Sequence, residues 1–328
     1  MEQTQKQADR LLVSFVLPCY RSAGTLPAVV REIDETMAGL PQYRTQIVMV
    51  CDGSPDDTWE TIRGLCEGHP DRIGINFARN FGQHAALMAG IRRAEGEYLV
   101  CLDDDGQTPA CEVGKLLGAL EDGADVVYAD YGGHKQHSLF RNFGTAMNEA
   151  MTQLLLGKPR DLFVSSYFAM RRFVAAEIAR YRNSYPYLIG LVLRATNRIV
   201  NVPVTHRRRE AGSSGYTFGK LLALWLNGFT AFSIKPLRIA TAIGAFCAAA
   251  GFLYGLYTIV KKMVNPAVPM GFSSLMSAVV FFGGMILLLL GLAGEYIGRT
   301  YISVNAAPQY VVREEMQSGD EDAPEWRV

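Results

Sequence analysis

The chain has 328 residues, of which 49% are hydrophobic, and its 32 lysine and arginine residues balance 32 aspartate and glutamate residues. This length allows one large soluble domain with an additional segment. The neutral balance gives no argument for nucleic-acid binding, which favours a basic domain. The apolar residues concentrate after Ile234 in two long stretches, whereas the preceding part has the composition of an ordinary α/β protein.

The cysteines and the N-terminal residues both bear on the cellular compartment. Six cysteines occur, and none forms a CxxC pair or has zinc-finger spacing: Cys19, Cys51, Cys66, Cys101, Cys111 and Cys247. Most lie in apolar runs, so we expect buried free thiols and a reducing environment. Residues 1–10 are polar and lack the apolar core of a signal peptide, so we expect the first domain to stay in the cytoplasm.

The first 130 residues alternate between short apolar runs, typical of buried strands, and segments with helical spacing. Strands are predicted over 11–18, 46–51, 73–77, 98–102 and 126–129. Helices are predicted between them over 26–37, over 57–66 with Ser54 as its cap, over 82–93 and after Thr108-Pro109. Two more helices are predicted further along the chain, over 138–156 and 187–196. This alternation predicts an α/β fold with a doubly wound, mainly parallel sheet. Ligands of such sheets bind beyond the carboxyl ends of the strands, so the polar clusters after the first, second and fourth strands are expected to converge.

Two uncharged apolar runs, 239–260 and 275–294, are each long enough to cross a hydrocarbon core of about 30 Å. They predict a transmembrane hairpin, and the alternative is a buried helical hairpin of a soluble protein. The preceding stretch, 217–233, contains Trp225 and is predicted to be an amphipathic helix in the membrane interface. The acidic tail after Arg313 is predicted to be disordered.

The predicted domain boundaries follow from these segments. They are a polar tail over 1–10, the α/β domain over 11–216, the interfacial helix over 217–233, the membrane hairpin over 234–300 and a C-terminal tail over 301–328. Lys235, Arg238 and Arg299 flank the hairpin and favour both ends inside, although Lys261 and Lys262 in its turn oppose this orientation. Small-xxx-small pairs, Gly244 with Ala248 and Gly251 with Gly255, make homo-oligomerisation a further prediction.

Asp52 ends the second predicted strand, in the sequence VCDGSPDD. A carboxylate there can accept hydrogen bonds from a base N–H or from ribose hydroxyls, and Gly53 permits the sharp turn that follows. The competing interpretation is an aspartate that caps the next helix.

Asp103, Asp104 and Asp105 end the fourth predicted strand. Three adjacent carboxylates repel one another unless a cation or solvent screens them. Mg²⁺ or Mn²⁺ prefers such oxygen ligands, and Gln107 can add a carbonyl oxygen. A metal held here would bridge a nucleotide diphosphate and stabilise the charge on the leaving group. A solvated acidic loop is the alternative.

Several basic residues are candidates for anion binding. Arg79 follows the third strand, just before a helix whose first N–H groups can also bind an anion, and His84 in that helix is expected to be structural or to contact a sugar. Arg141, Arg207, Arg208 and Arg209 are candidates for an acceptor phosphate, because arginine binds phosphate bidentately. For Arg207 and Arg208, a basic collar attracted to lipid headgroups explains the sequence equally well.

At these motifs the sequence resembles the family-2 glycosyltransferases of the dolichol-phosphate-mannose-synthase type, in the bacterial polyprenyl-phosphate branch with two C-terminal membrane helices. The resemblance covers nearly the whole chain, through VLPCYRSAGTL, VCDGSPDDT, RNFGQHAALMAG, LDDDGQTP, FRNFGTAMNEA, REAGSSGYTFGKL, KPLRI and GLAGEYIGRTY. RNFGQH and GEYIGR look most similar to undecaprenyl-phosphate formamido-arabinose transferases, and bactoprenol glucosyltransferases come next.

The resemblance implies a GT-A fold and inverting transfer of a sugar from a nucleotide sugar, with a UDP-sugar favoured, to undecaprenyl or polyprenyl phosphate. It implies a multi-pass bacterial inner-membrane enzyme whose product serves cell-envelope glycan assembly or lipid A modification. The residues expected to bind the donor are Pro18, Tyr20, Asp52, Arg79 and Asp104. Asp103, Asp105 and Arg209 are expected to be catalytic, and Asp105 and Gln107 are expected to bind the metal. The residues expected to bind the acceptor phosphate are Arg141, Arg209 and Ser214.

Three segments depart from the usual motifs of the family. The usual Asp-Asp-Gly-Ser begins with Cys51 here, and the usual Asp-x-Asp-Leu-Gln contains Asp104 and Gly106. The usual Gly-Glu-Ser-Lys-Tyr reads GSSGY over 212–216, so its lysine is absent, with Lys220 as a candidate replacement. These departures leave the identity of the sugar open.

Other classes of protein fit the sequence less well. The missing lysine favours a membrane-tethered nucleotide-sugar binding protein without catalysis, whereas the retained Asp105, Gln107, Arg141 and Arg209 favour an enzyme. A flippase needs more spans, a processive synthase carries Gln-x-x-Arg-Trp, and a dinucleotide dehydrogenase carries GxGxxG where Pro18-Cys19-Tyr20 stands here.

Overall fold

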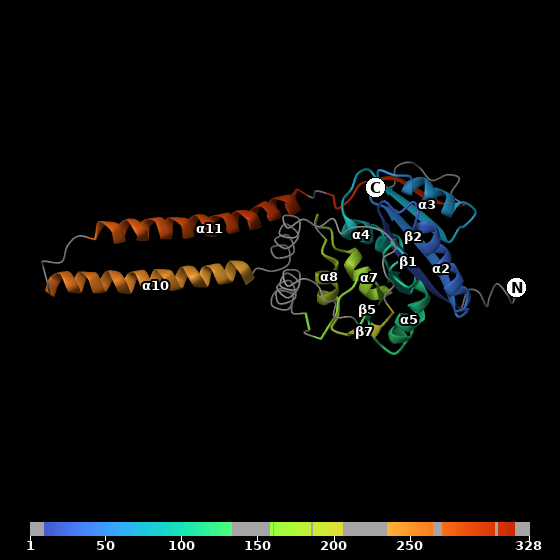
Figure 1. The fold of residues 1–328 in the computed structure, drawn as a ribbon, viewed down its shortest axis with the longest axis horizontal. Coiled ribbons are helices and arrows are strands. Elements are labelled where there is room, and N and C mark those ends of the chain that lie inside the picture. Colours follow the sequence, from blue (N-terminus) through green and yellow to red (C-terminus); the bar gives the residue numbers. More distant parts are fainter. Residues whose placement is uncertain are drawn as a thin grey trace. The chain divides into compact units, whose positions relative to one another are not determined.

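The computed structural model describes residues 10–132, 158–159, 161–184, 186–205, 235–264, 271–305 and 308–318. The chain divides into two compact units, one of residues 1–215 and 306–328 and the other of residues 216–305. We call their described parts the sheet domain and the helical hairpin (Figure 1). The helices predicted over 138–156 and 217–233 lie outside the described residues.

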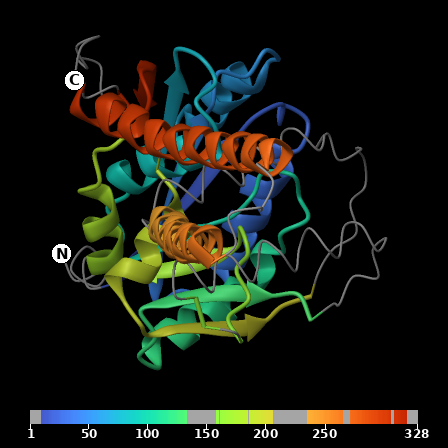
Figure 2. The same cartoon turned by 90° about the vertical axis from the view of Figure 1, so that its left-hand side faces the viewer.

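The described part of the sheet domain contains one eight-stranded sheet of order β7-β5-β6-β4-β1-β2-β3-β8. The strands are β1 (Leu11–Cys19), β2 (Tyr43–Cys51), β3 (Arg72–Phe77), β4 (Tyr98–Cys101), β5 (Val126–Asp130), β6 (Phe168–Arg171), β7 (Ile199–Pro203) and β8 (Val312–Gln317). The central β4-β1-β2-β3 set is parallel, as is the β5–β7 pair, which lies side by side in Figure 2. β6 and β8 are antiparallel to their neighbours. The predicted mainly parallel α/β sheet is therefore confirmed.

Helices cover both faces of this sheet because its central strands are apolar on both sides. The described helices of the sheet domain are α2 (Leu26–Ala38), α3 (Thr58–Cys66), α4 (Gln83–Arg93), the short 3₁₀ helix η1 (Ala110–Glu112), α5 (Val113–Glu121), α7 (Arg172–Ala179) and α8 (Leu188–Ala195). In β2, Ile47 and Met49 pack in one core cluster with α2, α3 and α5, whereas Val48 and Val50 pack in another with α4. Alternate side chains of β2 thus point into two different hydrophobic clusters, one on each face of the sheet.

A glycine lets α4 pack closely against β1. A Cβ atom at Gly90 would lie 2.3 Å from Cγ1 of Val16, which is closer than real contacts allow. This close packing fixes the helix next to the central strand, and the first turn of α4 lies beside the carboxyl end of β3. The position of that first turn matters for the candidate site.

Two expectations from the sequence need correction, and two strands were missed. Ser54 does not cap α3: its hydroxyl accepts a hydrogen bond from the backbone N–H of Arg21 at 2.8 Å, and the residue at the N-cap is Asp57. β6 and β7 were not predicted. The expectation of disorder after Arg313 is wrong for residues up to Gln317, because this polar segment forms β8 at the edge of the sheet.

The described cysteines agree with the expected free thiols. Cys19, Cys51, Cys66 and Cys101 are free thiols and are buried, whereas Cys111 is exposed. Burial raises the pKa of the Cys66 thiol to about 11, so this thiol stays protonated at neutral pH. These buried cysteines act as small apolar core residues.

The helical hairpin consists of α10 (Lys235–Val264) and α11 (Phe272–Val304). At 1.5 Å per residue, each helix is roughly 45–50 Å long, which exceeds a hydrocarbon core of about 30 Å. By length and composition, Ala240–Tyr257 and Phe281–Gly298 can each cross a membrane, and almost none of their residues is buried. The lack of burial argues against a hairpin in the core of a soluble protein.

Within the hairpin, one small residue of α10 faces α11. A Cβ at Gly244 would lie 3.7 Å from Cδ1 of Leu289, whereas one at Gly251 would meet no atom within 4 Å. The position of Gly244 therefore faces α11 of the same chain. Homo-oligomerisation through α10 stays a prediction.

Candidate functional site

The loops after β1, β2, β3 and β4 meet at one edge of the sheet, because these four parallel strands are neighbours and end on the same side. The loop after β1 contacts the loop after β4: the backbone N–H of Tyr20 donates to Oδ2 of Asp104 at 3.2 Å, and the Ser22 hydroxyl donates to the same oxygen. The structure thus brings together the clusters that the sequence placed after the first, second and fourth strands.

Asp52, which follows β2, is only 4% exposed, and its carboxylate faces the loop after β3. The backbone N–H of Phe81 donates to Oδ1 at 2.7 Å, and that of Gly82 donates to Oδ2 at 2.8 Å. Burial raises the pKa of Asp52, and these two backbone hydrogen bonds oppose that rise by favouring the charged form. Asp52 does not cap α3, so the competing interpretation from the sequence is wrong.

Gly53 explains why the loops after β2 and β3 lie so close together. Its φ of +58° is in the left-handed region, and a Cβ there would lie 2.4 Å from the carbonyl carbon of Arg79 and 2.5 Å from the N of Asn80. The Asn80 side chain also donates to the carbonyl oxygen of Asp52 at 3.1 Å. The turn at Gly53 therefore packs directly against the backbone of residues 79–80.

The three carboxylates after β4 have different surroundings. Asp103 accepts hydrogen bonds from Gln83 Nε2 at 2.8 Å and from the Ser166 hydroxyl at 2.5 Å. Asp104 accepts its bonds from the loop after β1, and Asp105 accepts one from the backbone N–H of Gln107 at 3.0 Å. The loop is therefore tied to its neighbours and is not a freely solvated acidic loop.

Burial and nearby negative charge raise the pKa values of Asp103 and Asp104. Burial raises the pKa of Asp103, and the nearby charge of Asp105 raises it further. Burial, with a contribution from the charge of Asp103, raises the pKa of Asp104 to about 6. A cation would offset this excess of negative charge.

The donor set suits a divalent cation that shares its ligands with a substrate. In the described part of the chain, no group of three His, Cys, Asp or Glu side chains is arranged to hold a metal by itself. Mg²⁺ commonly uses one or two carboxylates and takes its remaining ligands from phosphates and water. Asp103 and Asp105 fit that pattern, with the Gln107 carbonyl as an additional oxygen.

The other predicted residues fall into three groups. Pro18 is buried in β1, and Tyr20 beside it is 45% exposed at the site. Arg79 is exposed, and its guanidinium lies 4.4 Å from the centre of the Phe81 ring. The acceptor candidates lie outside the described residues: Arg141, Arg207, Arg208, Arg209 and Ser214, together with Lys220.

His84 has a structural environment. Its Nδ1 is buried without a hydrogen-bond partner among the described residues, and its ring lies edge-on to Tyr187 with centroids 5.5 Å apart. Burial lowers the pKa of His84, so the ring is neutral at physiological pH.

Sequence reasoning missed three residues that contact the carboxylates. Gln83 lies within the RNFGQH motif, so the sequence already pointed to this segment, although not to its contact with Asp103. Ser22 follows Tyr20 closely, but its bond to Asp104 spans 82 residues. Ser166 lies 63 residues beyond Asp103 in a segment without a motif, and only the tertiary fold reveals its contact.

A mainly parallel α/β sheet with aspartates after β2 and β4, the two strands on either side of β1, and with two long apolar helices after it, has the arrangement of a GT-A-like glycosyltransferase domain with a membrane hairpin. Comparison with known proteins agrees: residues 14–179 match the model "Glycosyl transferase family 2", and residues 235–300 match "GtrB C-terminal hairpin". The chain belongs to glycosyl transferase family 2.

Two curated relatives and one solved structure illustrate the likeness. The chain is 31% identical to undecaprenyl-phosphate 4-deoxy-4-formamido-L-arabinose transferase of Klebsiella pneumoniae, over 92% of each chain. It is 30% identical to the bactoprenol glucosyl transferase of Shigella phage SfV, over 93% of this chain and 99% of that protein. Glucosyl-3-phosphoglycerate synthase of Mycobacterium tuberculosis, solved with Mn²⁺, UDP and phosphoglyceric acid, shares the fold at 19% identity and a TM-score of 0.50, over 68% of this chain and 77% of that one.

Proposed function

We propose that this chain transfers a sugar from a nucleotide-sugar donor, with a UDP-sugar favoured, to undecaprenyl phosphate or a related polyprenyl phosphate. The observation that carries the proposal is the extent of the likeness to the formamido-arabinose and bactoprenol enzymes. It spans at least 92% of this chain and therefore includes both the sheet domain and the hairpin. The product would serve cell-envelope glycan assembly or lipid A modification.

The proposed donor site is the edge of the sheet formed by the loops after β1, β2 and β4. Each oxygen of Asp52 accepts one backbone hydrogen bond and keeps lone-pair capacity for a base N–H or a ribose hydroxyl. Pro18 and Tyr20 border this site, and Arg79 is exposed beside it for a phosphate. Asp104 joins two of the loops, so its proposed role in donor binding is to hold them in place.

Asp103, Asp105 and Gln107 would hold Mg²⁺ or Mn²⁺, which would stabilise the charge that develops on the departing nucleoside diphosphate. Gln83 and Ser166 orient the Asp103 carboxylate through their hydrogen bonds. The Mn²⁺ and UDP bound by the mycobacterial synthase, which shares the fold, support this assignment.

The proposed reaction is a single in-line displacement at the anomeric carbon. An oxygen of the lipid phosphate forms the new bond to that carbon while the bond to the nucleoside diphosphate breaks, and the diphosphate leaves with the electron pair. The acceptor phosphate is already an anion and needs positioning more than deprotonation. We assign that positioning to Arg141, Arg209 and Ser214.

We further propose that the sheet domain and both chain ends lie on the cytoplasmic face of the bacterial inner membrane, with residue 265 on the far side. The two apolar helices of the hairpin support this arrangement. Cysteines introduced at 265 and at the exposed position 311, and treated with an impermeant thiol reagent in intact cells, test it. Labelling at 265 alone is expected, and labelling at 311 alone would refute it.

The decisive test of transfer uses the purified full-length chain, undecaprenyl phosphate and a panel of nucleotide sugars. Mass spectrometry of the lipid fraction is expected to show one added sugar for one donor. Binding of a nucleotide sugar without any lipid product, across the panel, would favour the non-catalytic alternative. Asp122→Asn, which changes an exposed carboxylate after α5, serves as the matched control for Asp105→Asn and should retain product formation.

A further inference from the structure

The chain returns to the sheet domain after the hairpin, through residues 308–318, which we call the return segment. Its strand β8 pairs antiparallel with β3, from Ile73 opposite Gln317 to Phe77 opposite Val312. Without β8, the N–H and C=O groups along one side of β3 would lie at an open sheet edge. The return segment thus completes the sheet beside the strand that leads into the site.

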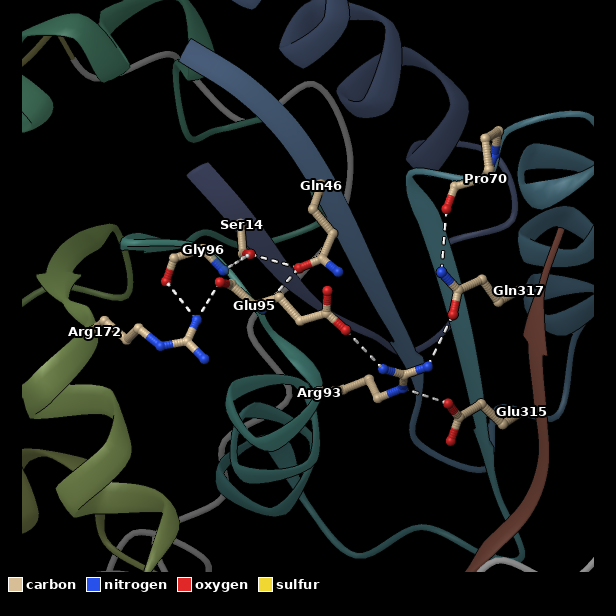
Figure 3. A network of polar contacts seen from close by, with 9 residues as sticks. All are labelled: Ser14, Gln46, Pro70, Arg93, Glu95, Gly96, Arg172, Glu315 and Gln317. Atoms are coloured by element: carbon tan, nitrogen blue, oxygen red, sulfur yellow. Dashed lines mark hydrogen bonds and ion pairs between the residues drawn. The ribbon is translucent and has the colours of Figure 1, made fainter. Parts of the chain in front are cut away.

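Polar side chains fasten the far end of β8 to α4 and to the sheet. Arg93 of α4 donates to Glu315 at 2.6 Å and to Gln317 at 2.8 Å, and Gln317 donates to the carbonyl of Pro70 at 3.2 Å. Figure 3 shows Arg93 between these groups and Glu95. The bonds to Glu315 and Gln317 help to fix the register of β8 against β3.

The near end of the return segment contacts the loop after β3. Ala78 has both backbone polar groups satisfied by it: its N–H donates to the carbonyl of Val311 at 2.9 Å, and its carbonyl accepts from the Arg313 guanidinium at 3.1 Å. Ala78 is the first residue of the loop that continues to Gly82. The return segment therefore determines where that loop starts.

Aromatic packing extends this contact along the loop. The ring of Tyr310 stacks on Phe77 with centroids 5.0 Å apart and planes within 9°, and Phe77 meets Phe81 edge-to-face at 5.7 Å. The Arg92 guanidinium donates a hydrogen bond to the Tyr310 hydroxyl at 3.0 Å. A chain of three rings thus runs from the return segment to Phe81.

Phe81 and Gly82 supply the two backbone N–H groups that orient the Asp52 carboxylate. A shift of this loop would therefore rotate or release the carboxylate. We propose that Tyr310 and Arg313 are positioning residues for donor binding, which act through residues 78–82 on Asp52. This inference rests on the proposed role of Asp52 in holding the nucleotide.

The test compares two ends of the same strand in the full-length protein. Tyr310→Ala and Arg313→Ala should raise the KM for the donor about tenfold, the effect of losing one or two well-placed contacts, with kcat and the KM for polyprenyl phosphate nearly unchanged. Arg313→Lys, which keeps a donor for the Ala78 carbonyl, should restore most of the donor KM. Gln317→Ala loses side-chain bonds at the other end of β8 and should change the donor KM by less than about twofold.

Hydrogen exchange separates this inference from the proposed function, because it needs no substrate. Peptides covering residues 78–84 should exchange faster in Tyr310→Ala and Arg313→Ala than in Gln317→Ala, since the Phe81 and Gly82 amides lose protection. Faster exchange there would support the positioning role even if the wild-type protein formed no lipid product. Unchanged exchange, or an equal rise in donor KM for Gln317→Ala and Arg313→Ala, would overturn it.

Discussion

The edge of the sheet and the helical hairpin use apolar residues in opposite ways. At the edge of the sheet, strands buried on both faces are followed by carboxylates that accept hydrogen bonds from neighbouring loops, as at Asp52 and Asp103. In the hairpin, large apolar side chains such as Phe246 and Leu287 are more than 70% exposed. The first region has the burial pattern of a domain surrounded by water, whereas the exposed apolar surface of the second suits an apolar medium.

This contrast separates the two tasks that a lipid-linked transfer requires. Under the proposed function, the sheet domain would offer fixed polar groups to a charged, water-soluble donor, and the hairpin would offer apolar surface to the membrane that contains the acceptor. Variants that add charge to the hairpin, or that remove charge or change a turn at the edge of the sheet, test the contrast directly. Their effects should decrease from the hairpin to the carboxylates and then to the backbone turn.

The largest effect is expected from placing charge on the exposed face of α11. Leu287→Arg combined with Leu290→Arg should cost about 5–7 kcal/mol of membrane insertion, at roughly 3 kcal/mol for each arginine near the centre of a span. Flotation of cell membranes measures the outcome. Phe173→Arg, at a 53% exposed position of the sheet domain, is the control and should float with the wild type. Because α10 can anchor the chain by itself, the decisive variant also carries Leu253→Arg and Leu256→Arg at exposed positions of α10. Normal flotation of that variant would contradict a membrane-spanning hairpin.

Next in size is the loss of a carboxylate at the proposed metal site. Asp105→Asn keeps the shape of the side chain but removes its charge. The activation free energy of transfer should therefore rise by several kcal/mol, which lowers the rate about a thousandfold or more. Thermal unfolding and flotation should stay as in the wild type. Excess chelator should abolish transfer by the wild type, and full activity in chelator would contradict metal dependence.

A smaller effect is expected at the turn after Asp52. Gly53→Ala forces a side chain into the left-handed region and against the backbone of Arg79, so it should destabilise the fold by about 2 kcal/mol. Thermal unfolding of the full-length protein measures this. Gly64→Ala is the matched control, because a Cβ at this position of α3 meets no atom within 4 Å. Equal melting temperatures for the two variants would show that the turn at Gly53 is not strained.

Much of the fold could be predicted from the sequence because the strands around the site are short, continuous apolar runs bounded by turns. β1 and β2 lie where their apolar residues indicated, and Asp52 and Asp103–Asp105 follow strands as expected. β8 could not be predicted, because VREEMQ is polar and its stability as a strand depends on β3 and Arg93. Contacts such as Phe81 to Asp52 also depend on loops that meet only in the folded chain.

The stereochemistry of the product tests the central claim of a direct displacement by the lipid phosphate. NMR of the anomeric linkage, in the donor and in the polyprenyl-phosphate sugar made by the purified full-length protein, reports the configuration before and after transfer. Inversion is expected, because one attack from the face opposite the leaving diphosphate reverses the configuration of the anomeric carbon. Retention of configuration would contradict it.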